Sequence, residues 1–463
     1  MAEATLFPLP APREPRAMPP TRPDAARVLR PDRQQVAWVA QDLDALLPAD
    51  HQARAIWALL ERLDLSTFYA QIKATVDRPG RPTADPRVLL ALWLLATVDG
   101  VGSARRLARL CEEHHAYQWV CGGVPINYHL LSDFRVAHHA ALDEILTQIV
   151  GSLMAAGAVT LEGVAQDGMR VRASAGAASF RRRARLQECL AVARERVERL
   201  AKEREHPDPG VNRREVAARE RAARERVARV EEALAYLPQA QAAKDRQQQT
   251  HSLERRVRVT EPRVSTTDPE ARVMKMPDGG FRPAYNVEFA TDQASGVIVG
   301  VDVTSEGTDA AQAAPMVEQV TERTGVCPQA YLMDGGFATR EAVTTLTRRG
   351  LTVYAPVRRS QSFHPSALPL KGKLEGQAGR TEEDRYVPHE GDTPEVVSWR
   401  ARMGTEEAKA VYRGRGATAE WSNAQARQHG VSQFTVRGIA KVITVMLLVA
   451  VTHNLLRWIA LGA

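Results

Sequence analysis

The sequence predicts an α/β fold: a mixed sheet with flanking helices, preceded by a helical N-terminal domain and carrying a helical insertion after its first strand. Short β-branched segments alternate with amphipathic segments in residues 281–357, which is typical of a sheet covered by helices. Apolar residues recur at helical spacing in residues 36–155, and Arg alternates with Glu in residues 180–260. With 463 residues, 44% of them hydrophobic, the chain is long enough to form more than one packed domain.

The N-terminal part divides into a leader and a helical domain. Residues 1–35 are rich in Pro and Arg and have no apolar periodicity, which predicts a disordered leader. In the helical domain, residues 36–155, the run 87–96 is apolar nearly all round and is expected to be buried. A Gly-containing break follows, after which Ser103 can cap the next helix. Short helices with Arg on their faces suit a DNA-binding domain of the helix-turn-helix kind, and a plain helical bundle is the alternative.

A second domain is predicted from residue 156 to residue 460, interrupted by two insertions. Residues 159–167 are short and apolar, which indicates a first strand that ends at Asp167. The insertion at 180–260 keeps a narrow apolar stripe among its charges, which predicts a helical hairpin. This hairpin is either a solvated pair of helices or a device that holds DNA or a second subunit.

The rest of the second domain alternates strands and helices. Residues 358–400 are irregular and form the second insertion. Gly414 and Gly416 are expected to interrupt the helical stretch 405–428. The expected elements are strands at 285–291, 297–303, 329–333 and 351–356, and helices at 309–324, 339–349, 405–428 and 436–459.

Charge and cysteine usage indicate the kind of partner and compartment. The net charge of +7 favours a polyanionic partner such as DNA, because Lys and Arg neutralise phosphates. The four cysteines include no Cys-x-x-Cys pair, which predicts a reducing compartment without disulfides. The longest apolar run, residues 442–451, is shorter than the roughly 20 residues that a membrane-spanning helix needs. These features predict a soluble cytoplasmic protein.

Three acidic residues stand in contexts that suit catalysis. Asp167 and Asp334 each end a predicted strand and are each followed by Gly, whereas Glu420 lies within the helical stretch 405–428. Strand ends in α/β sheets project side chains into a crevice where ligands bind, and the glycines permit a tight turn there.

Carboxylates in such positions suit Mg²⁺, a hard cation that prefers oxygen ligands. Two such ions can clamp an in-line phosphoryl transfer, with one at the attacking oxygen and one at the leaving oxygen. Periodicity and spacing alone do not single out the three residues, because Asp302, Glu306 and Asp309 compete with them.

The segments around these acids resemble the DDE transposases of bacterial insertion sequences. Asp167-Gly followed by a basic, β-branched stretch and Ala is similar to the family's first-aspartate motif, and Asp334-Gly-Gly-Phe is similar to its second. The family's Tyr-Arg-Glu-Lys/Arg signature is matched, with Arg in the last place, by Tyr412, Arg415, Glu420 and Arg427.

Further segments extend the resemblance to roughly residues 36–460. Residues 88–136, with Asp-Gly-Val-Gly-Ser and Asn-Tyr-His-Leu-Leu-Ser-Asp-Phe-Arg, resemble the family's N-terminal helical domain. The stretch Gly-Phe-Arg-Pro-Ala-Tyr-Asn-Val at 280–287 and the ending His-Asn-Leu-Leu-Arg at 453–457 resemble the insertion-sequence "eleven-eighty-two" group.

The resemblance implies an RNase H-like catalytic domain with a metal site. Asp167, Asp334 and Glu420 would be the catalytic residues and would hold two Mg²⁺ ions, for which Mn²⁺ would substitute. The terminal DNA phosphates would be gripped by Tyr412, Arg415 and Arg427. Arg170 and Arg172 are further candidates for DNA contact, because they are basic and lie close to Asp167 in the sequence.

The resemblance also implies the reaction and the partners. The protein would bind the terminal inverted repeats of its element, cleave beside them and join the 3′ ends to target DNA, as a homodimer on paired ends at the bacterial nucleoid. Two alternatives are a catalytically silent DNA-binding regulator and an RNase H-like nuclease that does not join DNA.

Overall fold

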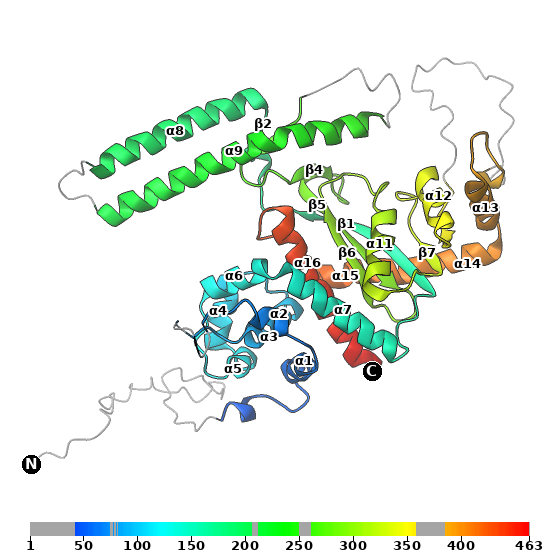
Figure 1. Ribbon diagram of the computed structural model, residues 1–463, viewed down its shortest axis with the longest axis horizontal. Helices are drawn as coiled ribbons and strands as arrows, with labels where there is room; N and C mark the ends of the chain where they lie inside the picture. Colours follow the sequence, from blue (N-terminus) through cyan, green and yellow to red (C-terminus); the bar gives the residue numbers. More distant parts are fainter. Residues whose placement is uncertain are drawn as a thin grey trace, which may run out of the picture. The chain divides into compact units, whose positions relative to one another are not determined.

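The computed structural model describes residues 42–462, except 75, 76, 78, 79, 81, 206–211, 250–260 and 358–384. The predicted leader at 1–35 lies outside the described residues, as do residues 358–384 of the irregular insertion predicted at 358–400. The end of that prediction is wrong, because residues 394–400 form the first part of a helix that Thr393 caps. In the described part, helices surround a mixed sheet, which confirms the predicted α/β class (Figure 1).

The sheet contains both parallel and antiparallel strands. β1 pairs antiparallel with β5 and parallel with β7, and β7 pairs parallel with β8. β4 and β6 both pair antiparallel with β5, so the order is β4-β5-β1-β7-β8 with β6 also beside β5. The strands are β1 (Gly163–Arg172), β4 (Arg272–Lys275), β5 (Phe281–Asp292), β6 (Ile298–Thr304), β7 (Ala330–Leu332) and β8 (Thr352–Tyr354). A separate two-stranded ribbon joins β2 (Phe180–Arg181) to β3 (Val264–Ser265).

The first strand is longer than the sequence predicts. β1 pairs with β5 from Val164 to Arg172, so Asp167 lies within the strand, and the expectation that it ends the strand is wrong. The glycine that follows does not make a turn. A Cβ atom at Gly168 would lie 2.8 Å from Oε1 of Glu288 on β5, so this position needs glycine to let that carboxylate approach.

The N-terminal region is helical, as predicted. Its third helix, α3 (Pro86–Val98), is buried along most of its length, because its apolar residues point in all directions. Ser103 accepts a hydrogen bond from the backbone N–H of Arg106, which confirms it as the cap of α4. The other elements are a 3₁₀ turn at Asp44–Leu46, α1 (Gln52–Glu61), α2 (Ser66–Tyr69), α4 (Ala104–Glu113), α5 (His115–Cys121), α6 (Tyr128–Ala137) and α7 (His139–Ala155).

Two long helices lie where the sequence predicts a hairpin. α8 (Arg183–Glu205) and α9 (Arg213–Gln249) run side by side in opposite directions (Figure 1). Ion pairs join them, such as Arg194 with Glu231 at 2.7 Å. Their shared stripe buries small and aliphatic side chains, which accounts for the narrow apolar periodicity of this segment.

The C-terminal helices pack around the sheet. The predicted helix at 405–428 is interrupted, as expected from its glycines: a π-helical turn at Gly416–Glu420 separates two α-helices. Such turns are rare and occur often at functional sites. The α-helices after β6 are α11 (Ala313–Thr324), α12 (Arg340–Arg348), α13 (Pro394–Met403), α14 (Glu406–Arg415), α15 (Trp421–Gln428) and α16 (Ile439–Leu461).

Helix α16 joins the sheet to the N-terminal helices. It packs against α7, β6 and α3, and appears in red between them in Figure 1. By length and composition it is the one candidate for a membrane span among the described residues, but 67% of its most apolar window is buried inside the protein. This burial agrees with the prediction of an apolar core helix at 436–459.

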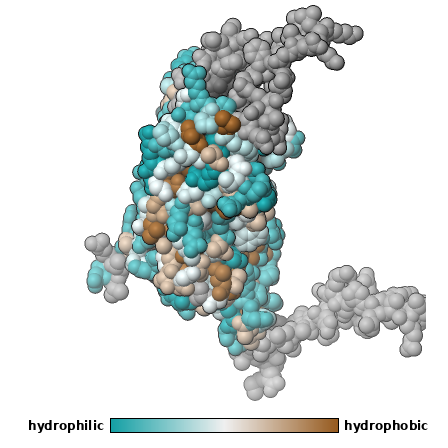
Figure 2. Space-filling view, turned by 90° about the vertical axis from the view of Figure 1, so that its right-hand side faces the viewer, coloured by the Kyte–Doolittle hydropathy of each residue, from teal (hydrophilic) through white to brown (hydrophobic). Residues whose placement is uncertain are grey.

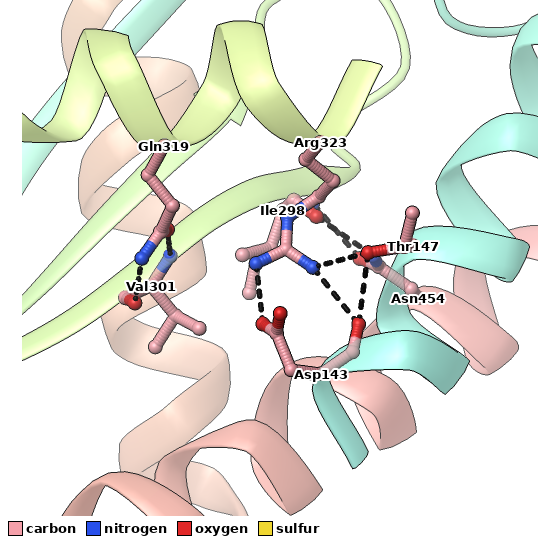
Figure 3. A network of polar contacts seen from close by, with 7 residues as sticks. All are labelled: Asp143, Thr147, Ile298, Val301, Gln319, Arg323 and Asn454. Atoms are coloured by element: carbon pink, nitrogen blue, oxygen red, sulfur yellow. Dashed lines mark hydrogen bonds and ion pairs between the residues drawn. The ribbon is translucent and has the colours of Figure 1, made fainter. Parts of the chain in front are cut away.

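Side chains from the helices cover the backbone of the edge strand β6. Asn454 on α16 accepts a hydrogen bond from the N–H of Ile298 and donates one to its carbonyl, both at 2.8 Å (Figure 3). Gln319 on α11 does the same for Val301. Because unpaired groups at a sheet edge can template pairing with another chain, these amides close the edge.

We expect Asn454→Ala to lower the free energy of unfolding by about 2–4 kcal/mol. The substitution leaves the N–H and C=O of Ile298 buried without partners, and each unsatisfied group costs about 1–3 kcal/mol. Urea denaturation measures the change, with the exposed Gln428→Ala as control. Equal stability of the two variants would show that Asn454 does not secure the edge.

A second contact in the same region joins α11 to the N-terminal helices. Arg323 donates to the carboxylate of Asp143 on α7 at 2.6 Å and to the hydroxyl of Thr147 at 2.9 Å (Figure 3). The Arg323 side chain is only 3% exposed, whereas that of Asp143 is 43% exposed, so the ion pair is shielded from solvent on the arginine side alone. On the face shown in Figure 2, hydrophobic residues form small separate patches in a mostly hydrophilic surface. Scattered patches of this kind are ordinary for a surface in contact with water.

Candidate active site

Two residues of the C-terminal helices donate hydrogen bonds to the carboxylate of Asp167. Its Oδ1 accepts a hydrogen bond from Nη2 of Arg415 at 2.8 Å, and its Oδ2 accepts one from Nδ2 of Asn423 at 2.9 Å. Arg415 ends α14 and Asn423 lies on α15, so the π-helical turn between them faces β1. The side chains of Asp167 and Arg415 are 19% and 9% exposed, and this ion pair is therefore largely shielded.

Asp334 lies beside Asp167 because of the parallel register of β1 and β7. Ala165 pairs with Leu332, and each aspartate follows two residues later in its own strand direction. The backbone N–H of Gly336 donates to Oδ1 of Asp334, which orients this carboxylate in the turn after β7. The adjacent strands thus bring together two of the three acids that the sequence singles out.

Two further carboxylates lie next to this pair. A Cβ atom at Gly336 would lie 2.7 Å from Oδ1 of Asp334 and 3.1 Å from Oδ2 of Asp309, so both carboxylates approach this glycine. Nδ2 of Asn286 donates to Oδ1 of Asp309 and to Oε1 of Glu288, both at 2.6 Å. The acidic centre, as we name it, consists of Asp167, Glu288, Asp309 and Asp334.

The protonation of the acidic centre follows from burial and crowding. Burial raises the pKa of Glu288 well above its ordinary value, and Asp309 raises it further. Burial also raises the pKa of Asp309, whereas hydrogen bonds from Asn286 and Glu288 favour its ionised form. Burial and the mutual repulsion of these carboxylates thus oppose the ionisation of Glu288 most strongly.

The pKa of Asp167 is likewise raised by some features of its surroundings and lowered by others. Burial raises its pKa, the charge of Arg415 lowers it, and the nearby charge of Asp334 raises it. Arg415 thus supplies a positive charge that offsets the repulsion between these carboxylates. A group of carboxylates that repel one another in a partly buried position is suited to bind a cation.

Glu420 is not brought to the acidic centre. It ends the π-helical turn with an exposed side chain, and none of the contacts among described residues joins it to Asp167 or Asp334. Within the described ranges, no three or more His, Cys, Asp or Glu side chains are arranged as a metal site. Glu420 does lie three residues before Asn423, which is the spacing of neighbours on one side of a helix.

The predicted phosphate-binding residues occupy different environments. Tyr412 is half-buried; burial raises its pKa, Arg415 lowers it, and the charges of Asp334 and Asp167 raise it, so its hydroxyl lies near the acidic centre. Arg427 is exposed on α15. Arg172 is also exposed, at the end of β1, whereas Arg170 donates to the backbone carbonyls of Lys275, at the end of β4, and Gly307, in the loop after β6. Arg170 therefore joins β4 to that loop.

Of the three acidic competitors, only Asp309 belongs to the acidic centre. Sequence reasoning missed two further residues of the site, Glu288 and Asn423. Glu288 lies on the predicted strand 285–291, whose other residues are all buried. A carboxylate among buried neighbours is itself a signal of function. Asn423 has only its spacing from Glu420 to mark it.

Two regions of the chain match known protein families. Residues 41–137 match the family described as Transposase domain (DUF772), and residues 382–459 match the family described as Transposase DDE domain. The first match covers α1 to α6, and the second covers Tyr412, Arg415, Glu420 and Asn423 together with most of α16. No curated protein and no solved structure matches the chain.

Proposed function

We propose, from the premise that the chain is a DDE transposase of an insertion sequence, that it binds the terminal inverted repeats of its element, cleaves DNA beside them and joins the 3′ ends to target DNA. The observation that supports this best is the side-by-side placement of Asp167 and Asp334, with Arg415 of the signature helix on Asp167. We propose further that the protein acts as a homodimer on paired ends, in the cytoplasm at the bacterial nucleoid.

The strand order supports an RNase H-like core for this function. The strands β6, β5 and β1 form an antiparallel group, and β7 and β8 follow β1 in parallel. In this arrangement the first aspartate lies on the central strand β1 and the second lies just after its parallel neighbour. The helical hairpin is then an insertion between the first two strands of the core.

The donor atoms of the site fit a divalent cation such as Mg²⁺. Oxygen atoms of Asp167 and Asp334 would hold it, and the carbonyl oxygen of Asn423 is buried without a hydrogen-bond partner beside them. When bound, such a cation activates a water or a DNA 3′-hydroxyl and stabilises the leaving oxygen. Arg415, released from Asp167, is then available to a DNA phosphate, and Tyr412 and Arg427 would grip the neighbouring phosphates.

We assign the third carboxylate to Glu420. Its position three residues before Asn423 puts it on the side of the helix that already touches Asp167. Its exposure leaves it accessible to a DNA end. The π-helical turn just before α15 offers local freedom for this side chain to turn toward the two aspartates once cation and DNA are present.

We expect Mg²⁺ or Mn²⁺ to raise the melting temperature, because a ligand that binds only the folded state stabilises it. The shift should disappear in Asp334→Asn and persist in the exposed control Asp278→Asn. It should also shrink as the pH falls, since protons compete with the cation for ionised carboxylates. Because the pKa of Asp167 is raised, this loss begins at a higher pH than for an ordinary aspartate. A metal-dependent shift of equal size in Asp334→Asn would remove this residue from the cation site.

A cleavage assay with a labelled duplex of the element's end tests the proposed function. Wild-type protein should cut the duplex with Mg²⁺ and leave it intact with EDTA, and it should join a pre-cut 3′ end to a second duplex. Binding without any metal-dependent cutting would instead indicate a silent regulator. Cutting without joining would indicate a nuclease.

A further inference from the structure

A pocket of about 470 Å³ lies at the root of the helical hairpin, outside the acidic centre. It is bounded by the residues just before α8, the later part of α9, the β2–β3 ribbon and strand β4. Arg182 and Arg263 are exposed in it, and Lys244 and Arg272 are half-buried. We name this site, lined by Arg182, Lys244, Arg263 and Arg272, the basic pocket.

Several arginines along the hairpin form ion pairs, whereas the arginines of the basic pocket form none with described residues. On the hairpin, Arg194 pairs with Glu231 and Arg219 pairs with Glu215, both at 2.7 Å. In the described part of the chain, no carboxylate pairs with any of the three pocket arginines. The three arginines therefore bring positive charge to one pocket without an ion pair, among the residues described, that offsets it.

Two acids lie at the basic pocket, where Glu261 is part of the lining and the charge of Asp245 acts on Lys244, and each of them accepts a hydrogen bond. Glu261 accepts a hydrogen bond from the backbone N–H of Arg183 at 3.0 Å, where α8 begins. Asp245 accepts one from Nε2 of Gln241 at 2.7 Å. Partial burial lowers the pKa of Lys244, and the charges of the surrounding arginines lower it further. The cations thus repel one another, and a bound anion would relieve that repulsion.

We propose that the basic pocket binds backbone phosphates of DNA, as a second contact with the element's ends. That the polyanion is DNA rests on the proposed function. The arginines offer forked N–H donors that match a phosphate, and the pocket has room for a phosphate and its sugar. In the sheet, Ala284 pairs with both Arg272 and Arg172, so these arginines share one face two strands, or roughly 10 Å, apart. Phosphate contacts would therefore continue from the pocket to Arg172 at the end of β1.

Salt-dependent binding to a fluorescent duplex of arbitrary sequence tests the proposal, with EDTA present so that no cleavage occurs. The double variant Arg182→Gln/Arg263→Gln removes two exposed pocket charges. The double variant Arg194→Gln/Arg219→Gln removes the same charge from the hairpin and serves as matched control. Melting temperatures of both variants verify that the chain folds. The slope of log Kobs against log salt concentration should fall by roughly 2 in the pocket variant, because each lost phosphate contact removes about 0.9.

Equal slopes for the pocket variant and the wild type would overturn the proposal, as would the same loss in the hairpin control. Tighter binding of an RNA duplex than of DNA would overturn the assignment to DNA. Since binding is measured without metal, the pocket is judged independently of catalysis. A protein that never cuts DNA but loses slope only in the pocket variant would keep the basic pocket and refute the transposase chemistry.

Discussion

Asp167→Asn is expected to lower the rate of metal-dependent DNA cleavage roughly 1,000-fold or more. A metal site contributes several kcal/mol of stabilisation to the developing charge, and each 1.4 kcal/mol corresponds to a factor of ten in rate. The amide is uncharged and is a poorer ligand, whereas its size preserves the packing beneath α14 and α15. We expect the same loss for Asp334→Asn, because Asp334 follows the parallel neighbour of the strand that carries Asp167 and would share the cation with it.

The interpretation requires that the variants still fold and bind DNA. Asp167 also accepts hydrogen bonds from Arg415 and Asn423, so its variant is compared with wild type by melting temperature and by affinity for the uncut duplex. Asp334 is the cleaner test, since its amide variant can keep the hydrogen bond from Gly336. Asp278→Asn, on the exposed turn before β5, should cut at the wild-type rate. If the variant of Asp167 or of Asp334 cut DNA at the wild-type rate, that aspartate would not be a catalytic residue.

Local patterns in the sequence were sufficient to predict most of the fold. The helical N-terminal region, the hairpin of β5 and β6 and the glycine-interrupted helix before α16 each follow from periodicity and turn residues within a few positions. The extent of β1 could not be found in this way. A strand continues for as long as its partner provides backbone groups, and β5 provides them as far as Arg172. β4 is only four residues long, too short for alternation to mark it.

The candidate site was predictable only in part, because its contacts are not local. Asp167 and Asp334 follow from motif and strand position. The contact between Asp167 and Arg415 spans 248 positions, and that with Asn423 spans 256. Glu288 meets the site through its cross-strand pairing with Gly168, which depends on register. No spacing along the chain encodes such register, and so a residue of ordinary appearance can occupy the centre of the site.

The second large effect concerns the third carboxylate, for which Glu420 and Asp309 are rivals. Glu420→Gln should lower the cleavage rate at least about 100-fold, because it would remove the proposed third cation ligand and its negative charge. Asp309→Asn should have a much smaller effect. Asp309 already accepts a hydrogen bond from Asn286, so we expect it to act as a support for the acidic centre. Rates are compared in the same Mg²⁺-dependent assay.

The two outcomes separate a site that forms upon binding from one that is already built. Glu407→Gln, a second exposed glutamate in the first turn of α14, controls for loss of surface charge near the site and should cut normally. If Asp309→Asn lost cleavage while Glu420→Gln kept it, the third ligand would be the residue that already lies beside Asp334, and the signature glutamate would have another role. If Glu420→Gln alone lost cleavage, the carboxylate of Glu420, just before the helix that carries Asn423 and Arg427, must turn toward the two aspartates when DNA binds. Catalysis would then be coupled to the correct seating of the DNA end, because the third ligand is in place only in the loaded complex.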